Sequence, residues 1–251
     1  MSDTRKNNAR LALVTGGGSG IGRATALALA ESGCVVTVCG RREAPLRETA
    51  ALHPAITPVV ADVTSEADMA RIHAQPFDIV VANAGFAESA PAAKTSLDQW
   101  RATLDANLTG AFLTVRPALA SMAKRRAGRI VFVASTAGLK GYAYVAPYVA
   151  AKHGVVGLMR ALAIELAAGG VTVNAVCPGF VETDLLQESI DRIVATTGKS
   201  VDDARAALRR TNPQGRFVQP AEVAAAVLYL CGEGAGSVTG QCLSISGGET
   251  W

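Results

Sequence analysis

The feature that most constrains the fold of this 251-residue chain is a regular alternation of short apolar runs with longer helix-like stretches. Several of the short runs are rich in valine and apolar on both faces, which is typical of strands covered above and below. Alternating strands and helices favour a parallel sheet with right-handed crossover connections. The pattern predicts strands at 11–14, 34–39, 57–60, 78–82, 129–134, 171–176 and 241–245, and helices at 21–32, 43–51, 65–73, 98–125, 147–168 and 221–231.

These elements predict an α/β fold built on one Rossmann-like, doubly wound parallel sheet of about seven strands, with helices on both faces. We expect a single domain over residues 10–251, because one large sheet suits this length, after a flexible polar tail at residues 1–9. Residues 180–219 interrupt the alternation, and a short helix is predicted within them at 201–210. An insertion of this length is often a lid over a binding site, with a plain surface excursion as the alternative.

The composition narrows the class of protein. The 24 basic and 21 acidic residues give a net charge of +3 with no basic block, so no nucleic-acid partner is expected. No apolar run reaches the roughly 18 residues of a membrane span, and residues 1–10 lack the apolar core of a signal peptide. The five cysteines show no CxxC spacing and the three histidines have no partners at ligand spacing. We expect a cytoplasmic protein with free thiols, no metal and no membrane partner.

A glycine-rich turn directly follows the first predicted strand. Residues 15–22 read TGGGSGIG, and an alanine-rich helical pattern comes next. Such a turn lets backbone N–H groups approach a pyrophosphate, and the N-terminus of the following helix favours the negative charge. The turn therefore predicts a dinucleotide site that includes Gly16, Gly18, Ser19, Gly20, Ile21 and Gly22.

The end of the second predicted strand bears on the choice of cofactor. An NAD site usually has a carboxylate there for the ribose 2′-hydroxyl, whereas this strand runs into Arg41 and Arg42. Two guanidiniums could bind a 2′-phosphate, which favours NADP(H). If both arginines are solvated residues at a helix start, NAD(H) remains the alternative. The ends of the next two strands complete the predicted cofactor site with Asp62, Val63, Asn83, Ala84 and Gly85.

Tyr148 and Lys152 form a candidate acid/base pair. Residues at i and i+4 share one face of a helix, so the ammonium would favour phenolate and lower the pKa of the phenol from about 10. Ser135 ends the fifth predicted strand, and its hydroxyl could hold a carbonyl oxygen beside the phenol. The three side chains therefore predict proton exchange with a carbonyl or an alcohol.

Together these residues resemble the short-chain dehydrogenase/reductase family, over about residues 10–248. Residues 146–157 and 173–183 look most like the β-ketoacyl and polyketide ketoreductases and the acetoacetyl-CoA-type reductases. Ala82 stands where the family often has a second asparagine, and Phe86-Ala87-Glu88 stands where some polyketide ketoreductases have Pro-Gly-Gly. The resemblance rests on residues 15–22, Asn83-Ala84-Gly85, Asn107, Ser135, Tyr148-x-x-x-Lys152, Pro178-Gly179 and Thr183.

The resemblance implies a role for each of these positions. Asn107, Ser135, Tyr148 and Lys152 would be catalytic, with Asn107 binding a water that links Lys152 to solvent. Tyr148 and Lys152 would also contact the cofactor, and Lys152 would bind the nicotinamide ribose. Thr183 would bind the carboxamide of the nicotinamide. The same cofactor region would include Pro178, Gly179 and Val181.

The implied function is an oxidoreductase that transfers hydride between NADP(H) and a ketone or secondary alcohol, with a β-ketoacyl thioester as one candidate substrate. An NAD-dependent secondary-alcohol or hydroxyacyl dehydrogenase is the alternative. A catalytically silent, cofactor-binding regulator is the alternative of another class. The resemblance also implies a homotetramer, with one interface at helices 98–125 and 147–168 and a second at the last helix and strand. Because a tryptophan at a chain end is more often an interface anchor than a solvated residue, we also expect Trp251 to pack on a neighbouring subunit.

Overall fold

The computed structural model describes residues 9–251. Over these residues seven strands form one sheet in the order β3-β2-β1-β4-β5-β6-β7, and every neighbouring pair is parallel. The predicted doubly wound parallel sheet is confirmed, whereas the expected tail at residues 1–9 lies almost wholly outside the described residues. The strands are β1 (Leu11–Thr15), β2 (Val35–Gly40), β3 (Ile56–Val60), β4 (Ile79–Ala82), β5 (Gly128–Val133), β6 (Val171–Pro178) and β7 (Cys242–Ile245).

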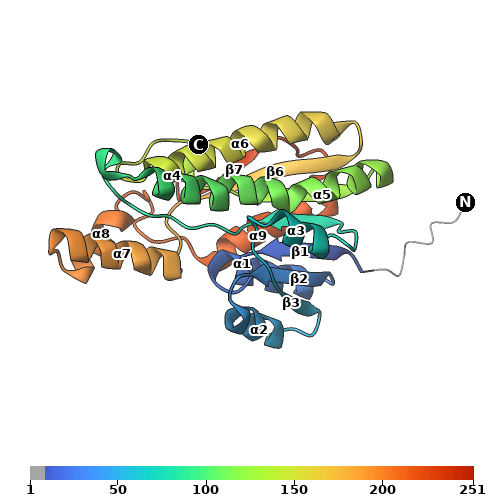
Figure 1. Ribbon diagram of the computed structural model, residues 1–251, viewed down its shortest axis with the longest axis horizontal. Coiled ribbons are helices and arrows are strands. Elements are labelled where there is room, and N and C mark those ends of the chain that lie inside the picture. The colour runs from blue at the N-terminus through green and yellow to red at the C-terminus, as the bar shows by residue number, and fades with distance from the viewer. Residues whose placement is uncertain (1–8) are drawn as a thin grey trace, which may run out of the picture.

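Two layers of helices cover the sheet. One face carries α1 (Gly20–Glu31), α2 (Glu43–Ala51) and α9 (Pro220–Cys231). The other carries α3 (Glu66–Ile72), α5 (Gly110–Arg125) and α6 (Ala146–Ala167), with α4 (Leu97–Leu104) beside α6 (Figure 1). Side chains of β1 alternate between the two cores: Val14 packs on the first side and Leu13 on the second. Because both faces are buried, the strands need apolar residues at nearly every position, which explains the valine-rich runs.

The predicted helix at 98–125 is wrong as a single element. The α-helix α4 ends at Leu104, residues Asp105–Thr109 form one π-helical turn (η2), and α5 begins at Gly110. The apolar pattern continues through the turn, so periodicity alone did not reveal it. A π-turn widens a helix by one residue and is frequent at functional sites. This turn contains Asn107, which is buried.

The segment between β6 and α9 contains two helices, where the sequence predicted only the one at 201–210. The additional helix is α7 (Asp184–Thr197), and α8 spans Val201–Arg209. Leu186 and Ile190 lie one turn apart on α7 and pack with Ala204 and Phe217 in a small core of their own. Gly198 ends α7 in the left-handed conformation, with φ of 68°. Residues 180–219, which we call the lid segment after one of the two roles expected for them, therefore contain a pair of packed helices at one end of the molecule (Figure 1).

Three short 3₁₀ turns complete the described secondary structure: η1 (Ala92–Lys94), η3 (Thr136–Gly138) and η4 (Glu233–Ala235). Within residues 9–251, none of the helices is long and apolar enough to cross a membrane.

Candidate active site

The glycine-rich turn after β1 is packed so tightly that side chains are excluded. Gly16 and Gly20 have positive φ angles of 66° and 50°. A Cβ on Gly22 would lie 2.2 Å from the carbonyl oxygen of Gly16 and 2.6 Å from Asn83 Nδ2. Ser19, the N-cap of α1, makes no side-chain capping bond. Because the first N–H groups of an α-helix have no partner within the helix, this end of α1 is suited to an anion.

Thr15 and Asn83 join β1 to β4, at the point where the order of strands along the sheet reverses. Thr15 Oγ1 accepts hydrogen bonds from the backbone N–H groups of Asn83 (3.0 Å) and Ala84 (3.1 Å). Asn83 Nδ2 donates to the Thr15 carbonyl at 2.8 Å. Ligands of doubly wound sheets bind at such a reversal, outside the carboxyl ends of the strands. Thr15 was not predicted as a site residue, although it immediately precedes the glycine motif.

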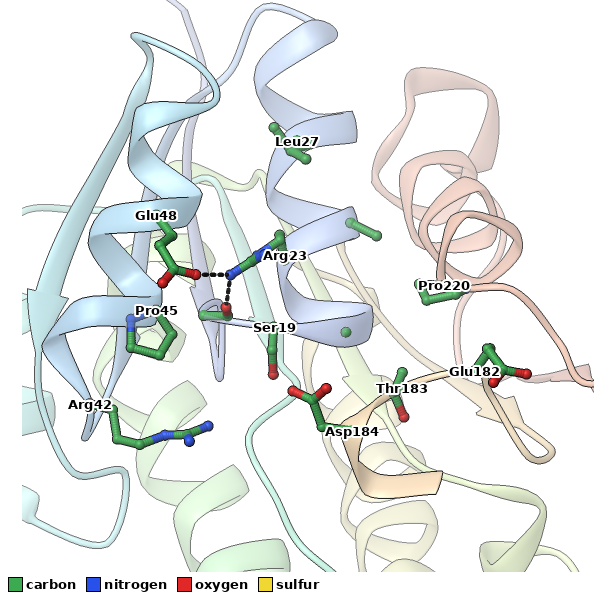
Figure 2. A pocket seen from close by; sticks show the side chains of 13 residues that line it. Ser19, Arg23, Leu27, Arg42, Pro45, Glu48, Glu182, Thr183, Asp184 and Pro220 are labelled. Atoms are coloured by element: carbon green, nitrogen blue, oxygen red, sulfur yellow. Dashed lines mark hydrogen bonds and ion pairs between the residues drawn. The ribbon is translucent and has the colours of Figure 1, made fainter. Parts of the chain in front are cut away.

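A cavity of about 530 Å³ opens beside this turn (Figure 2). Its walls include Gly18, Ser19 and Gly20 of the turn, Arg42 at the start of α2, and Thr183 at the start of α7. Arg41 does not line the cavity, and both arginines are exposed. Neither guanidinium is hydrogen-bonded or ion-paired to any residue in the range 9–251, so the charge of Arg42 is available to a ligand.

Arg23, which sequence reasoning missed, holds the glycine turn against α2. Its Nη2 donates to the Gly18 carbonyl at 2.6 Å and to Glu48 Oε2 at 3.0 Å (Figure 2). Its Nε donates to Thr49 Oγ1 at 3.0 Å. The side chain therefore sets the distance between the turn and the helix that carries Arg42. Its only sequence signal is a long cationic residue directly after the last glycine of the motif.

The other predicted cofactor residues lie along the same sheet edge. Asp62 Oδ1 accepts hydrogen bonds from the N–H and hydroxyl of Thr64, and Val63 is buried against Gly110. Ile21, in the first turn of α1, is partly buried against the core on that face. Gly85 is exposed, and a Cβ there would lie 2.4 Å from Asn107 Oδ1.

Residues after β6 approach the glycine turn from the opposite side. Gly179 donates its N–H to the Ile245 carbonyl, and Val181 forms an isolated parallel bridge with Val218. A Cβ on Gly20 would lie 2.9 Å from Thr183 Cγ2, so Thr183 sits directly against the turn. Pro178, the last residue of β6, is buried. The structure thus brings the start of the lid segment next to the predicted pyrophosphate site.

Tyr148, Lys152 and Ser135 converge at the ends of β5 and α6. Tyr148 lies in the first turn of α6, and Lys152 follows one turn later, with its Nζ 5.5 Å from the centre of the Tyr148 ring. Lys152 is buried and donates a 2.9 Å hydrogen bond to the Val133 carbonyl. Ser135 caps η3 by accepting a hydrogen bond from the Ala137 N–H at 3.1 Å.

Burial shifts the pKa values of Tyr148 and Lys152 in opposite directions. It raises the pKa of Tyr148 above its ordinary value of 10, and hydrogen bonding with Ser135 opposes the rise. It lowers the pKa of Lys152 from 10.5 to about 8. The expectation that Lys152 brings the pKa of Tyr148 below 10 is therefore wrong for the chain alone. Desolvation, which penalises the phenolate, is the largest cause of the rise.

Asn107 supplies a buried acceptor beside Lys152. Its Nδ2 donates to the carbonyls of Phe86 (2.9 Å) and Thr103 (3.0 Å). Its Oδ1 is buried and has no hydrogen-bond partner among residues 9–251. A Cβ added at Gly85 would lie 2.4 Å from Asn107 Oδ1 and 3.7 Å from Lys152 Nζ, so the amide oxygen and the ammonium border the same small space. A buried carbonyl oxygen without a partner is costly, which indicates that it serves a water or ligand.

The arrangement fits a dinucleotide. The glycine turn, which has no room for side chains, leads into the N-terminus of α1, and the guanidinium of Arg42 faces the cavity. The phenol of Tyr148, the ammonium of Lys152 and the hydroxyl of Ser135 lie at the same edge of the sheet. Over the described part of the chain, no three His, Cys, Asp or Glu side chains gather as metal ligands.

Comparisons with known proteins agree with this geometry. Residues 10–193 match the family model described as short chain dehydrogenase. The chain is 39% identical to a D-beta-hydroxybutyrate dehydrogenase of Cupriavidus necator, over 96% of this chain and 98% of that protein. It is 36% identical to an acetoacetyl-CoA reductase of Shinella zoogloeoides, again over 96% and 98%.

The same architecture occurs in a solved variant of actinorhodin polyketide ketoreductase with NADPH. That structure matches with a TM-score of 0.90 and 41% identity, covering 96% of this chain and 97% of that one. A family model that spans most of the chain, and relatives similar over nearly their whole length, agree with the residues of the site. The protein belongs to the short-chain dehydrogenase/reductase family of NAD(P)-dependent oxidoreductases.

Proposed function

We propose that this protein is an NADPH-dependent reductase that converts a ketone into a secondary alcohol. The observation that carries the proposal is the convergence of Tyr148, Ser135 and Lys152 at the sheet edge that also holds the glycine turn. A proton donor, a group that can position an oxygen and a buried cation are what carbonyl reduction requires.

The cofactor would be held by residues that follow five strand ends. The N-terminus of α1 and the glycine turn would hold the pyrophosphate, and Arg42 would pair with the 2′-phosphate. Asp62 with Val63 would bind the adenine side, Asn83-Ala84-Gly85 the cofactor beside β4, and Val181 with Thr183 the carboxamide. The NADPH in the structure of the similar ketoreductase supports the same cofactor here. NADPH, when bound, supplies the hydride that reduces the carbonyl carbon.

Tyr148 and Ser135 would carry the proton chemistry. The Ser135 hydroxyl would hold the carbonyl oxygen of the substrate beside the phenol, and the Tyr148 hydroxyl would donate its proton to that oxygen. The raised pKa keeps Tyr148 protonated near neutral pH, which is the state a proton donor needs. Lys152, with a pKa of about 8, is mostly protonated at pH 7 and would favour the phenolate left behind. Asn107 Oδ1 would hold a water that returns a proton toward Lys152.

The substrate class we infer is a β-ketoacyl thioester or a ketone of similar shape. Similarity to an acetoacetyl-CoA reductase and to a polyketide ketoreductase supports this class. An NAD-dependent dehydrogenase working in the oxidative direction is the second candidate, supported by the similarity to a D-beta-hydroxybutyrate dehydrogenase. The exposed Arg41 and Arg42, with no acidic residue at the end of β2, favour the first.

We further propose a cytoplasmic homotetramer. Exposed apolar side chains support it on both expected interfaces: Phe112 on α5 and Ile164 on α6, then Tyr229 on α9, Leu243 on β7 and the exposed Trp251. Light scattering of the purified protein measures the mass directly, and a stable monomer would remove this part of the proposal.

The activity is tested by measuring oxidation of NADPH and of NADH with a panel of ketones and β-ketoacyl thioesters, with the alcohol product identified by mass spectrometry. We expect turnover with NADPH to exceed that with NADH at least tenfold, about 1.4 kcal/mol. A rate with NADH that equals or exceeds the rate with NADPH would contradict the cofactor assignment. No alcohol product from any carbonyl compound, with NADPH bound, would contradict the activity.

A further inference from the structure

Glu249 carries a carboxylate that is buried to an unusual degree for a residue outside the catalytic group. It lies in the segment after β7, and its side chain is only 1% exposed. Oε1 pairs with Lys140 Nζ at 3.0 Å and accepts a hydrogen bond from the Tyr142 hydroxyl at 2.5 Å. Oε2 is buried and has no hydrogen-bond partner within residues 9–251. Burying a carboxylate is costly unless it is paired and hydrogen-bonded, and here Lys140 and Tyr142 are its partners.

The direction of the hydrogen bonds in this cluster follows from the number of protons. Tyr142 has one hydroxyl proton, and a carboxylate can only accept, so that proton is committed to Glu249. The Thr136 hydroxyl, 2.6 Å from the Tyr142 oxygen, must then be the donor in its bond with Tyr142. A one-way chain therefore runs from Thr136 through Tyr142 to Glu249, and Thr136 is the residue directly after Ser135.

The cluster lies beside the proposed proton donor. The hydrogen bond with Thr136 ties Tyr142 to the residue directly after Ser135. Burial together with Glu249 raises the pKa of Tyr142. The proton of Tyr142 is held by Glu249 and is therefore not free for a substrate. The Tyr142 ring also meets the ring of Phe180 edge to face, with centres 6.4 Å apart. These two rings form an apolar wall between the loop after η3 and the start of the lid segment.

Glu249 is the point at which three segments meet. A Cβ on Gly179, at the end of β6, would lie 3.0 Å from Glu249 Oε2. Gly247, with φ of 64°, passes so close to Asn212 of the lid segment that a Cβ would lie 2.0 Å from Asn212 Oδ1. The loop that carries Lys140 and Tyr142 is itself strained, because Tyr144 has φ of 67° although it is not a glycine. Strain in a loop persists where surrounding contacts hold it in place, and Glu249 provides two of those contacts.

We propose that Glu249 is a positioning residue that sets the substrate specificity of the site. By holding Tyr142 and Lys140, it fixes the wall of Tyr142 and Phe180 beside Tyr148, so that the site favours ketones with a compact apolar group and rejects bulky ones. This inference rests on the proposed ketone reduction. It assigns to Glu249 no contact with the substrate.

The test compares two ketones of different size, ethyl acetoacetate and 1-tetralone, in Glu249→Ala, Glu249→Gln and Tyr142→Phe. Relative to wild type, the preference in kcat/KM for the compact ketone should fall roughly tenfold in Glu249→Ala, mainly through KM, because a hydrogen bond to a charged group is lost. Glutamine keeps the shape and an acceptor oxygen, so Glu249→Gln should lie between wild type and alanine. The matched control is Glu233→Gln, which alters an exposed carboxylate elsewhere.

A second readout does not depend on activity. The ultraviolet absorbance of tyrosinate, measured against pH in wild type and Tyr142→Phe, isolates the ionisation of Tyr142. The pH midpoint of Tyr142 ionisation should be lower in Glu249→Gln than in the protein with Glu249, because the carboxylate that accepts the Tyr142 proton is gone. Variants that fold, keep the preference of the wild type and leave the Tyr142 titration unmoved would overturn the proposal. A wild-type protein that reduces no ketone would overturn the proposed function and the specificity role with it, while the titration would still decide whether Glu249 holds Tyr142.

Discussion

The buried charge of Lys152 should lower the stability of the fold at neutral pH. Replacing Lys152 with methionine should therefore give a more stable but inactive protein. The side chain is 4% exposed, and burial lowers its pKa from 10.5 to about 8. A difference of that size between the folded and unfolded chains corresponds to about 3 kcal/mol. The variant loses the hydrogen bond to the Val133 carbonyl, which removes about 1 kcal/mol. We therefore expect Lys152→Met to be more stable than wild type by about 2 kcal/mol at pH 7.

The effect has a definite dependence on pH. Below pH 8 the amine is protonated in both the folded and the unfolded chain, so the full cost of burying the charge is present. Between pH 8 and pH 10.5 the unfolded chain still binds the proton and the folded chain does not, so the contribution of Lys152 to stability rises with pH. Other groups also titrate in this range, so the informative quantity is the difference in the free energy of unfolding between wild type and Lys152→Met. This difference should become smaller as the pH rises.

Urea unfolding followed by circular dichroism, at pH 7 and again near pH 10, measures that difference. Lys199→Met is the matched control, because Lys199 is exposed and its removal should change stability little. The reasoning is refuted if Lys152→Met is less stable than wild type at pH 7, or if the difference between the two proteins does not narrow at the higher pH.

Three further variants test the cofactor side of the site. Arg42→Met should raise KM for NADPH roughly tenfold and leave KM for NADH nearly unchanged, since a charge-assisted bond to phosphate is lost; an equal rise for both in steady-state kinetics would argue against a phosphate contact. Arg23→Met should weaken both cofactors equally in fluorescence titrations, because Arg23 holds the Gly18 carbonyl; a loss confined to NADPH would contradict this. Gly22→Ala should abolish cofactor binding and lower Tm, because its Cβ would lie 2.2 Å from the Gly16 carbonyl oxygen, whereas Gly234→Ala, which meets no atom within 4 Å, should do neither.

Periodicity and turn chemistry were sufficient to predict the sheet and the glycine turn at its edge. The strands are buried on both faces and therefore read as valine-rich runs, and the glycine turn between β1 and α1 tolerates no side chain at Gly22. These are local constraints, each visible within a few residues. The sequence spacing also placed Tyr148 and Lys152 on one helix face, because that relation depends only on helix geometry.

What could not be predicted depends on contacts distant along the chain. The bond between Tyr142 and Glu249 joins residues 107 positions apart, and no pattern links them. The pKa of Tyr148 was expected to fall because the sequence shows the neighbouring lysine but not the burial, which raises this pKa. The π-turn at Asn107 leaves the apolar pattern unbroken. Helix α7 is a different case, since Leu186, Ile190 and Gly198 were signals that the sequence contained and the interpretation overlooked.

The central claim is that Tyr148 donates the proton to the substrate oxygen, and Tyr148→Phe tests it most directly. The phenyl ring keeps the packing of α6 and removes only the hydroxyl. We predict that kcat for ketone reduction with NADPH falls by about 10²–10⁴-fold, the usual contribution of general acid catalysis, while the Kd for NADPH in a fluorescence titration changes by less than about threefold. Tyr144→Phe, at an exposed position, should remain active. A Tyr148→Phe protein that still reduces the ketone at the wild-type rate would contradict the account.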